Sequence, residues 1–166
     1  MRYHDITTED MANGEGLRVV LWTAGCSHHC KGCQNSFTWD ADGGLLFDAA
    51  AKEELYTELA KTYIAGVTFS GGDPLHPANR DSIAALAAEI KTRYPQKSIW
   101  LYTGANWEDI WQMPLMRNID VLVDGEYQVA LADKQLHWRG SSNQRVIDVS
   151  RTLLGSMPNV PVLYCE

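Results

Sequence analysis

Basic residues are in short supply in this chain. It has 14 lysines and arginines against 21 aspartates and glutamates, for a net charge of −7. A protein that grips the phosphates of a nucleic acid needs clustered lysine and arginine, so this deficit argues against nucleic-acid binding. The sequence also lacks an apolar run of about 18 residues, which excludes a membrane-spanning helix.

Residues 1–16 contain no apolar stretch behind a basic start, so we expect no signal peptide and a cytoplasmic location. Internal repeats, low-complexity tracts and long blocks of like charge are also missing. With 166 residues, of which 45% are hydrophobic, the chain can bury a core without disulfides. We therefore predict a single domain over residues 1–166, with a cysteine-bearing loop at 24–39 and a C-terminal tail from about 151 to 166.

Cysteine is scarce, and its placement is uneven. Of the four cysteines, Cys26, Cys30 and Cys33 lie within eight residues of one another, and Cys165 is next to last. A disulfide framework normally spreads its cysteines along the chain. The tight triplet instead indicates thiolates directed at one metal centre.

Short β-branched runs alternate with amphipathic stretches along the chain. This alternation indicates β-α units joined by right-handed crossovers. Because so few strands cannot close an eight-stranded barrel, we predict an open partial (β/α) barrel of about five to six mostly parallel strands. The expected strands are 17–23, 66–70, 98–103, 119–123 and 144–149, and the expected helices are 48–63, 79–94 and a short one after Asn106.

Unusual residues follow each of the first four expected strands. The cysteine triplet follows the first, Gly71-Gly72-Asp73 the second, Gly104 the third and Asp124-Gly125 the fourth. Loops at the carboxyl ends of parallel strands share one face of the sheet and build its site. We therefore expect these motifs to converge.

The triplet by itself admits two kinds of metal centre. Three thiolates on a four-iron cluster would leave one iron without a protein ligand, where a substrate could bind and receive an electron. Alternatively, the three cysteines with His28, His29 or Cys165 could complete a closed tetrahedral zinc site. The spacing differs from the bacterial ferredoxin run and from paired zinc knuckles.

The segment Ser70-Gly71-Gly72-Asp73-Pro74 also has two interpretations. Successive glycines can expose backbone N–H and C=O groups to a ligand, and the Asp73 carboxylate can face an ammonium group. The same residue types also form simple tight turns.

Taken together, these residues resemble a known family. The C-x-x-x-C-x-x-C triplet is similar to that of the radical S-adenosylmethionine superfamily, and segments 13–18 and 34–40 resemble its glycyl-radical-activating branch. Segments 70–77 and 138–145 are most similar to activating proteins of anaerobic ribonucleoside-triphosphate reductases. The resemblance covers about residues 1 to 150.

The resemblance implies a set of site residues. Cys26, Cys30 and Cys33 would bind a [4Fe–4S] cluster and form its catalytic centre, and S-adenosyl-L-methionine would chelate the fourth iron. Gly71, Gly72 and Asp73 would contact the methionine ammonium, and the backbone of Gly32, Cys33 and Gln34 would lie near the adenine. Two positions depart from the superfamily's usual pattern: Gly32 replaces a common apolar side chain, and Asp73 replaces a common glutamate.

The resemblance also implies the reaction and the partners. A reduced cluster would cleave S-adenosyl-L-methionine to a 5′-deoxyadenosyl radical, which would take a hydrogen from a glycine of the reductase. The expected partners are that reductase and a low-potential electron donor such as flavodoxin. The rival interpretations are a zinc-binding interaction module, and a radical enzyme that acts on a small molecule or on another glycyl-radical protein.

Overall fold

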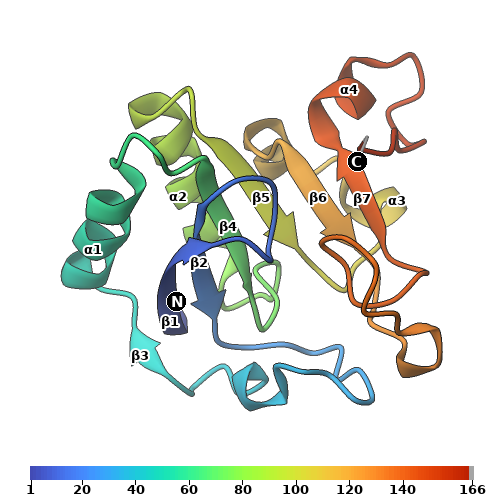
Figure 1. The fold of residues 1–166 in the computed structure, drawn as a ribbon, viewed down its shortest axis with the longest axis horizontal. Helices are drawn as coiled ribbons and strands as arrows, with labels where there is room; N and C mark the ends of the chain where they lie inside the picture. Colours follow the sequence, from blue (N-terminus) through green and yellow to red (C-terminus); the bar gives the residue numbers. More distant parts are fainter. Residues whose placement is uncertain (165–166) are drawn as a thin grey trace.

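The protein forms one open sheet of seven strands with helices packed against it (Figure 1). The structure is a computed structural model, and it describes residues 1–164. The strand order is β3-β1-β2-β4-β5-β6-β7. The strands are β1 (Arg2–Asp10), β2 (Arg18–Thr23), β3 (Leu45–Leu46), β4 (Gly66–Gly71), β5 (Ser98–Tyr102), β6 (Val121–Asp124) and β7 (Arg145–Asp148).

The parallel strands expected from the sequence form the centre of the sheet. Strands β2, β4, β5 and β6 pair in parallel, in that order. Strand β1 pairs antiparallel with β2, and β7 pairs antiparallel with β6. The α/β class is confirmed, and the sheet is open. The expected five to six strands are too few, because β1 and β3 were not foreseen.

Strand β1 escaped sequence analysis because it carries little of the usual strand signal. Its sequence, RYHDITTED, is polar and holds only two buried hydrophobic residues, Tyr3 and Ile6. Its pairing with β2 and β3, rather than an apolar run, makes it a strand.

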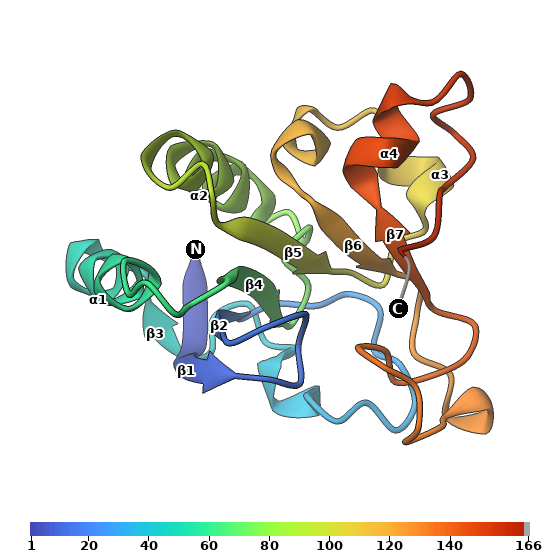
Figure 2. The same ribbon diagram turned by 45° about the horizontal axis from the view of Figure 1, so that its top comes forward.

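The helices cover one face of the sheet, and long loops cover the other (Figure 2). The helices are α1 (Ala49–Leu59), α2 (Arg80–Arg93), α3 (Trp107–Ile110) and α4 (Val149–Leu154), with short 3-10 turns at Ser36–Thr38, Pro114–Asn118 and Val129–Leu131. The main core lies between helices and sheet and includes alternate strand residues: Val19, Leu21, Val67, Phe69, Ile99, Leu101, Leu122 and Ile147. The intervening residues therefore face the loops.

The helices α1 and α3 begin where the sequence predicts, but only one of their two predicted capping side chains caps its helix. Asp48 caps α1 as expected, accepting from the N–H groups of Ala50 and Ala51 at 3.0 Å each. The side chain of Asn106 does not cap α3, because the first N–H of that helix donates to Asp124 Oδ2 at 2.8 Å. Asp124 is therefore a buried structural residue at this helix start.

Arg18 is the largest polar group buried on the loop-facing side of the sheet. It is fully buried, and it donates to Thr68 Oγ1 at 2.8 Å, to the Val67 carbonyl at 2.7 Å and to Ser98 Oγ at 2.9 Å. Its guanidinium also lies 5.4 Å from the centre of the Trp100 ring. Burial lowers the pKa of Arg18 to about 10. Arg18 thus ties the starts of β2, β4 and β5 together.

Within residues 1–164, no helix is both long enough and apolar enough to cross a membrane.

We predict that Arg18→Met lowers the free energy of unfolding by about 2–4 kcal/mol, because buried acceptors lose their donor. Urea denaturation followed by circular dichroism measures this. Arg80→Met is the matched control, since Arg80 is exposed and has only a 3.9 Å ion pair with Asp81. If both variants are equally stable, the Arg18 hydrogen bonds do not hold the strands together.

Candidate functional site

The cysteine loop follows β2 and closes on itself through backbone hydrogen bonds. The N–H of Gly25 donates to the Thr38 carbonyl at 2.7 Å, and that of Cys26 donates to the Trp39 carbonyl at 3.0 Å. Gly25 has φ +103°, a conformation that favours glycine, so the chain can turn sharply at the strand end. The loop therefore has a fixed base at the carboxyl edge of the sheet.

Backbone N–H groups lie close to the cysteine sulfurs of this loop. The Cys33 sulfur accepts a hydrogen bond from the N–H of Asn35 at 3.4 Å. The backbone of His28 and His29 lowers the pKa of Cys26, and that of Tyr127 lowers the pKa of Cys30. All three cysteines are half-buried and free of disulfides.

Burial is the main cause that raises the pKa of Cys26 and of Cys30, and nearby backbone N–H groups oppose it. Cys30 also raises the pKa of Cys26, and Cys33 raises that of Cys30, so the sulfurs are electrostatic neighbours. Thiols in this setting would ionise on binding iron, which offsets their mutual repulsion.

Three cysteine thiolates in one loop are the donor type that holds an iron–sulfur cluster. Two thiolates on one zinc lie within about 4.6 Å of each other, because each Zn–S bond is about 2.3 Å. No three His, Cys, Asp or Glu side chains among residues 1–164 are placed to hold one metal ion. A four-iron cluster instead spreads its ligands over different irons, and N–H donors to the sulfurs are typical of such clusters. Cys165, the other proposed zinc ligand, lies outside the described residues.

The glycine loop after β4 packs backbone to backbone against the base of the cysteine loop. Gly71 has φ +103°, and a Cβ there would lie 2.6 Å from the Thr23 nitrogen. A Cβ on Gly72 would lie 2.4 Å from the Gly25 carbonyl oxygen. No larger residue fits at either position without displacing the backbone.

The expected exposure of this loop's N–H groups is only partly realised. The N–H of Gly72 donates to the Thr23 carbonyl at 2.8 Å, and that of Asp73 donates to the Gly25 carbonyl at 2.7 Å. These two donors are used inside the protein. The Asp73 carboxylate is held inside the protein as well, since its Oδ1 accepts from the N–H of Leu75 at 2.8 Å.

Asp73 lies at the centre of a hydrogen-bonded chain that joins four strand ends, those of β2, β4, β5 and β6. It is 4% exposed, accepts from Thr103 Oγ1 at 3.1 Å and lies 2.8 Å from His28 Nε2. His28 Nδ1 lies 2.8 Å from Glu126, in the loop after β6. The hydrogen bond with Asp73 is the largest cause that raises the pKa of His28, to about 9, against the effect of burial.

His28 therefore bridges two carboxylates, and both of its ring nitrogens are occupied by protein groups. Its ring also lies over Gly104, where a Cβ would approach to 2.6 Å. The motifs that follow the first four strands thus do converge. Glycine at 104 makes room for the ring that joins them.

The residues expected near the adenine lie at the far side of the cysteine loop. Gly32 is exposed, has φ +76° and faces Val129, whose Cγ2 would lie 3.2 Å from an added Cβ. The N–H of Cys33 donates to the Cys30 carbonyl at 3.1 Å. Gln34 is exposed and lines a hollow on the loop-covered face.

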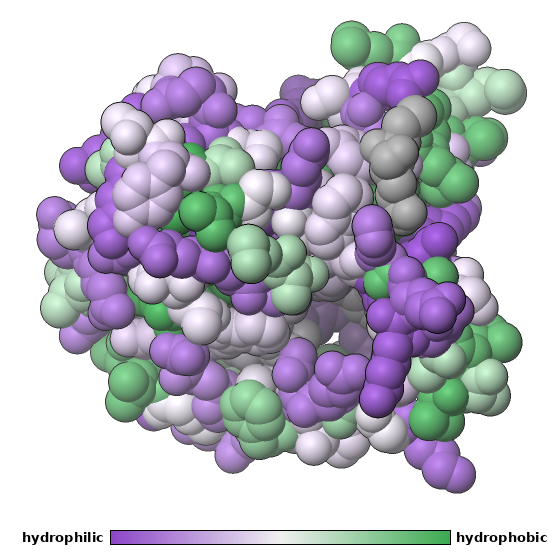
Figure 3. All heavy atoms as spheres, viewed as in Figure 1, coloured by the Kyte–Doolittle hydropathy of each residue, from purple (hydrophilic) through white to green (hydrophobic). Residues whose placement is uncertain are grey.

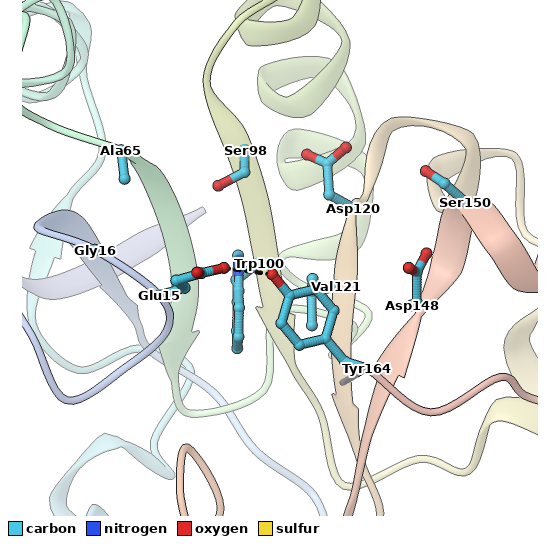
Figure 4. A pocket seen from close by; sticks show the side chains of 10 residues that line it. All are labelled: Glu15, Gly16, Ala65, Ser98, Trp100, Asp120, Val121, Asp148, Ser150 and Tyr164. Atoms are coloured by element: carbon cyan, nitrogen blue, oxygen red, sulfur yellow. Dashed lines mark hydrogen bonds between the residues drawn. The ribbon is translucent and has the colours of Figure 1, made fainter. Parts of the chain in front are cut away.

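Two hollows of similar size open on the loop-covered face. One, of about 580 Å³, lies at the amino ends of β5 and β6, away from the cysteines (Figure 4). Its carboxylates already have partners: Glu15 accepts from Tyr164, Asp120 from Lys91 and Asp148 from the N–H of Arg151. This hollow is therefore not a candidate active site.

The other hollow, of about 590 Å³, lies between the cysteine loop and the 127–140 segment. Trp22 and Tyr102 contribute the sheet side of its lining, and Figure 3 shows the molecule hollowed to the right of centre on this face. A smaller hollow of about 410 Å³ lies beside His28, Gly104 and Glu126. The candidate site thus comprises the cysteine loop, the hydrogen-bonded chain around Asp73, the hollow of about 590 Å³ and the hollow of about 410 Å³.

Sequence reasoning missed Tyr102 and Glu126. Tyr102 is two residues after Trp100 in β5, so strand alternation places it on the loop-covered face. Glu126 directly follows the Asp124-Gly125 pair that marked the end of the fourth strand, which was the available signal.

Comparison with known proteins gives a consistent result. Residues 12–147 match the family described as a 4Fe-4S single cluster domain. The chain is 48% identical over 146 residues to the anaerobic ribonucleoside-triphosphate reductase-activating protein of Enterobacteria phage T4, covering 88% of this chain and 93% of that protein.

Bacterial proteins of the same name are similarly related. Identity is 42% over 149 residues to that of Vibrio cholerae, covering 87% of this chain and 96% of the relative. Identity to the Escherichia coli K12 protein is 41% over 150 residues, covering 88% of this chain and 97% of the relative. The chain therefore belongs to the family of anaerobic ribonucleoside-triphosphate reductase-activating proteins and carries its 4Fe-4S domain.

Proposed function

We propose that this protein is a radical S-adenosyl-L-methionine enzyme that activates an anaerobic ribonucleoside-triphosphate reductase by forming a glycyl radical on it. The family membership and the names of the relatives support this activity. The observation that carries it is a loop of three half-buried cysteines, free of disulfides, at the strand ends where the buried Asp73 carboxylate also lies.

In this proposal Cys26, Cys30 and Cys33 hold the [4Fe–4S] cluster. With three protein thiolates as ligands, one iron would stay open to the amino and carboxylate groups of S-adenosyl-L-methionine. Asp73 faces the ammonium group, and Gly71 and Gly72 allow the Asp73 loop to approach closely enough. The support for this assignment is the tight backbone packing at these glycines, which holds Asp73 next to the base of the cysteine loop.

The adenine lies along the backbone of Gly32, Cys33 and Gln34. Because Gly32 offers no side chain, the nearby Val129 and Tyr127 supply the apolar surface there. In this assignment, Val129 and Tyr127 take the place of the apolar side chain that is common at position 32 in the superfamily.

When bound, the reduced cluster supplies one electron that cleaves the sulfonium, so that methionine and a 5′-deoxyadenosyl radical form and the radical takes a glycine Cα hydrogen. The protein's residues hold the reactants and exclude water from the radical. The open sheet, as a partial (β/α) barrel, admits a segment of the reductase. A low-potential donor such as flavodoxin supplies the electron, in a reducing cytoplasm.

The direct test is anaerobic incubation of the reconstituted, reduced protein with the reductase and S-adenosyl-L-methionine, followed by electron paramagnetic resonance. We expect a glycyl doublet on the reductase. Cys26→Ala, Cys30→Ala and Cys33→Ala each abolish it, because each removes an iron ligand. Cys165→Ala, the matched cysteine control, retains nearly full signal.

A colourless protein with stoichiometric zinc and no glycyl doublet would contradict the proposal. A brown protein that makes 5′-deoxyadenosine but no doublet would keep the radical chemistry and reject the reductase as substrate.

We predict that Asp73→Asn weakens S-adenosyl-L-methionine binding about 10- to 100-fold, because a charge-assisted contact with the ammonium is lost. The change that the ligand causes in the spectrum of the reduced cluster, titrated with ligand, measures the affinity. Asp81→Asn, at an exposed position at the start of α2, leaves it unchanged. Equal affinity in both variants would remove Asp73 from the binding site.

A further inference from the structure

The hollow between the cysteine loop and the 127–140 segment contains two buried polar groups without partners. Among residues 1–164, neither the Tyr102 hydroxyl nor Arg139 Nε has a hydrogen-bond partner. Tyr102 and Arg139 both line this hollow. Burial of the phenol raises the pKa of Tyr102 well above its usual range, so this group stays protonated and can donate.

Unpartnered buried groups are uncommon, because each forfeits its hydrogen bonds to water without replacement. Arg139 is otherwise well held, since its Nη1 donates to the Gln144 carbonyl at 2.9 Å. Tyr102 lies on a buried central strand that fixes its ring. Both groups are therefore held in place beneath the lining of the hollow, and a ligand that displaces the atoms covering them can satisfy them.

The chemistry of the hollow favours a ligand that carries hydrogen-bond acceptors. Arg139 Nε can only donate, and the Tyr102 hydroxyl can donate or accept. The amides of Asn13, Gln34 and Asn35 also line the hollow, and they can pair with both C=O and N–H groups. Main-chain peptide groups present this alternation of acceptors and donors. The volume of about 590 Å³ suits a few residues of extended chain.

The charge of Arg139 argues against placing the cofactor's cationic groups in this hollow. S-adenosyl-L-methionine carries a sulfonium and an ammonium, which the Arg139 guanidinium repels. Lys134 and Asp133, which are exposed parts of the lining, largely offset each other. The carboxylates of Asp109 and Glu126 instead line the smaller hollow beside His28.

We propose that Tyr102 and Arg139 position the reductase segment that carries the reacting glycine, by donating to its main-chain carbonyl oxygens. This rests on the function proposed above and adds where the protein substrate lies. The two side chains are positioning residues: they hold the glycine Cα at the distance that hydrogen transfer requires.

The test is Tyr102→Phe, which keeps the ring and removes only the hydroxyl. With intact reductase as the probe, we expect the KM for the reductase to rise about ten-fold, as for loss of one hydrogen bond. We also expect more 5′-deoxyadenosine per glycyl radical than wild type gives, because a poorly held glycine lets the radical be quenched elsewhere. Arg139→Gln shows the same two changes.

Two further readouts separate positioning from other roles. The affinity for S-adenosyl-L-methionine stays at the wild-type value, and the thermal midpoint of Tyr102→Phe does not fall, because the hydroxyl has no partner to lose. Tyr164→Phe is the matched control: its hydroxyl bonds Glu15 in the other hollow. It leaves the KM for the reductase and the product ratio unchanged.

An unchanged KM and product ratio in Tyr102→Phe would overturn the inference. So would a weakened affinity for S-adenosyl-L-methionine, which would assign the hydroxyl to the cofactor, or a clear drop in thermal midpoint, which would make it structural. Absence of a glycyl radical with the wild-type protein would instead reject the function itself.

Discussion

Backbone-to-backbone contact between two loops is the constraint on which the rest of the site depends. The glycine loop after β4 rests on the base of the cysteine loop, with Gly72 and Asp73 donating to carbonyls of Thr23 and Gly25. Glycine at 71 and 72 is what lets the two main chains meet. This contact fixes Asp73 under the cysteine loop, where its carboxylate holds His28. Disturbing it would move the carboxylate and the thiols relative to each other.

Much of the fold and of the candidate site could be predicted from the sequence, because the patterns that encode them are local. The cysteine spacing, the glycine pair and the apolar runs of β2, β4, β5 and β6 are all short-range patterns. What sequence reasoning missed depends on tertiary contacts: β1 is a strand through its pairing, and the start of α3 is capped by Asp124 from another strand. The His28 bridge joins residues that are 45 and 98 positions apart in the chain.

Charge divides the site into two parts with different chemistry. Carboxylates of Asp73 and Glu126 surround His28 on one side of the cysteine loop, and Arg139 with the unpartnered Tyr102 hydroxyl lies on the other. The proposed adenine and peptide contacts meet at Gln34 and Tyr127, which line the same hollow as Tyr102 and Arg139. An open sheet with loops on one face allows both the cofactor and the peptide to approach the same cluster.

The central claim is that the protein leaves one iron of the cluster free for S-adenosyl-L-methionine. Electron–nuclear double resonance on the reduced cluster, with the cofactor's amino nitrogen labelled with ¹⁵N, tests it most directly. The account predicts a hyperfine coupling to the label, which shows that the amino group binds iron. No coupling, with all four irons ligated by the protein's own side chains, would contradict it.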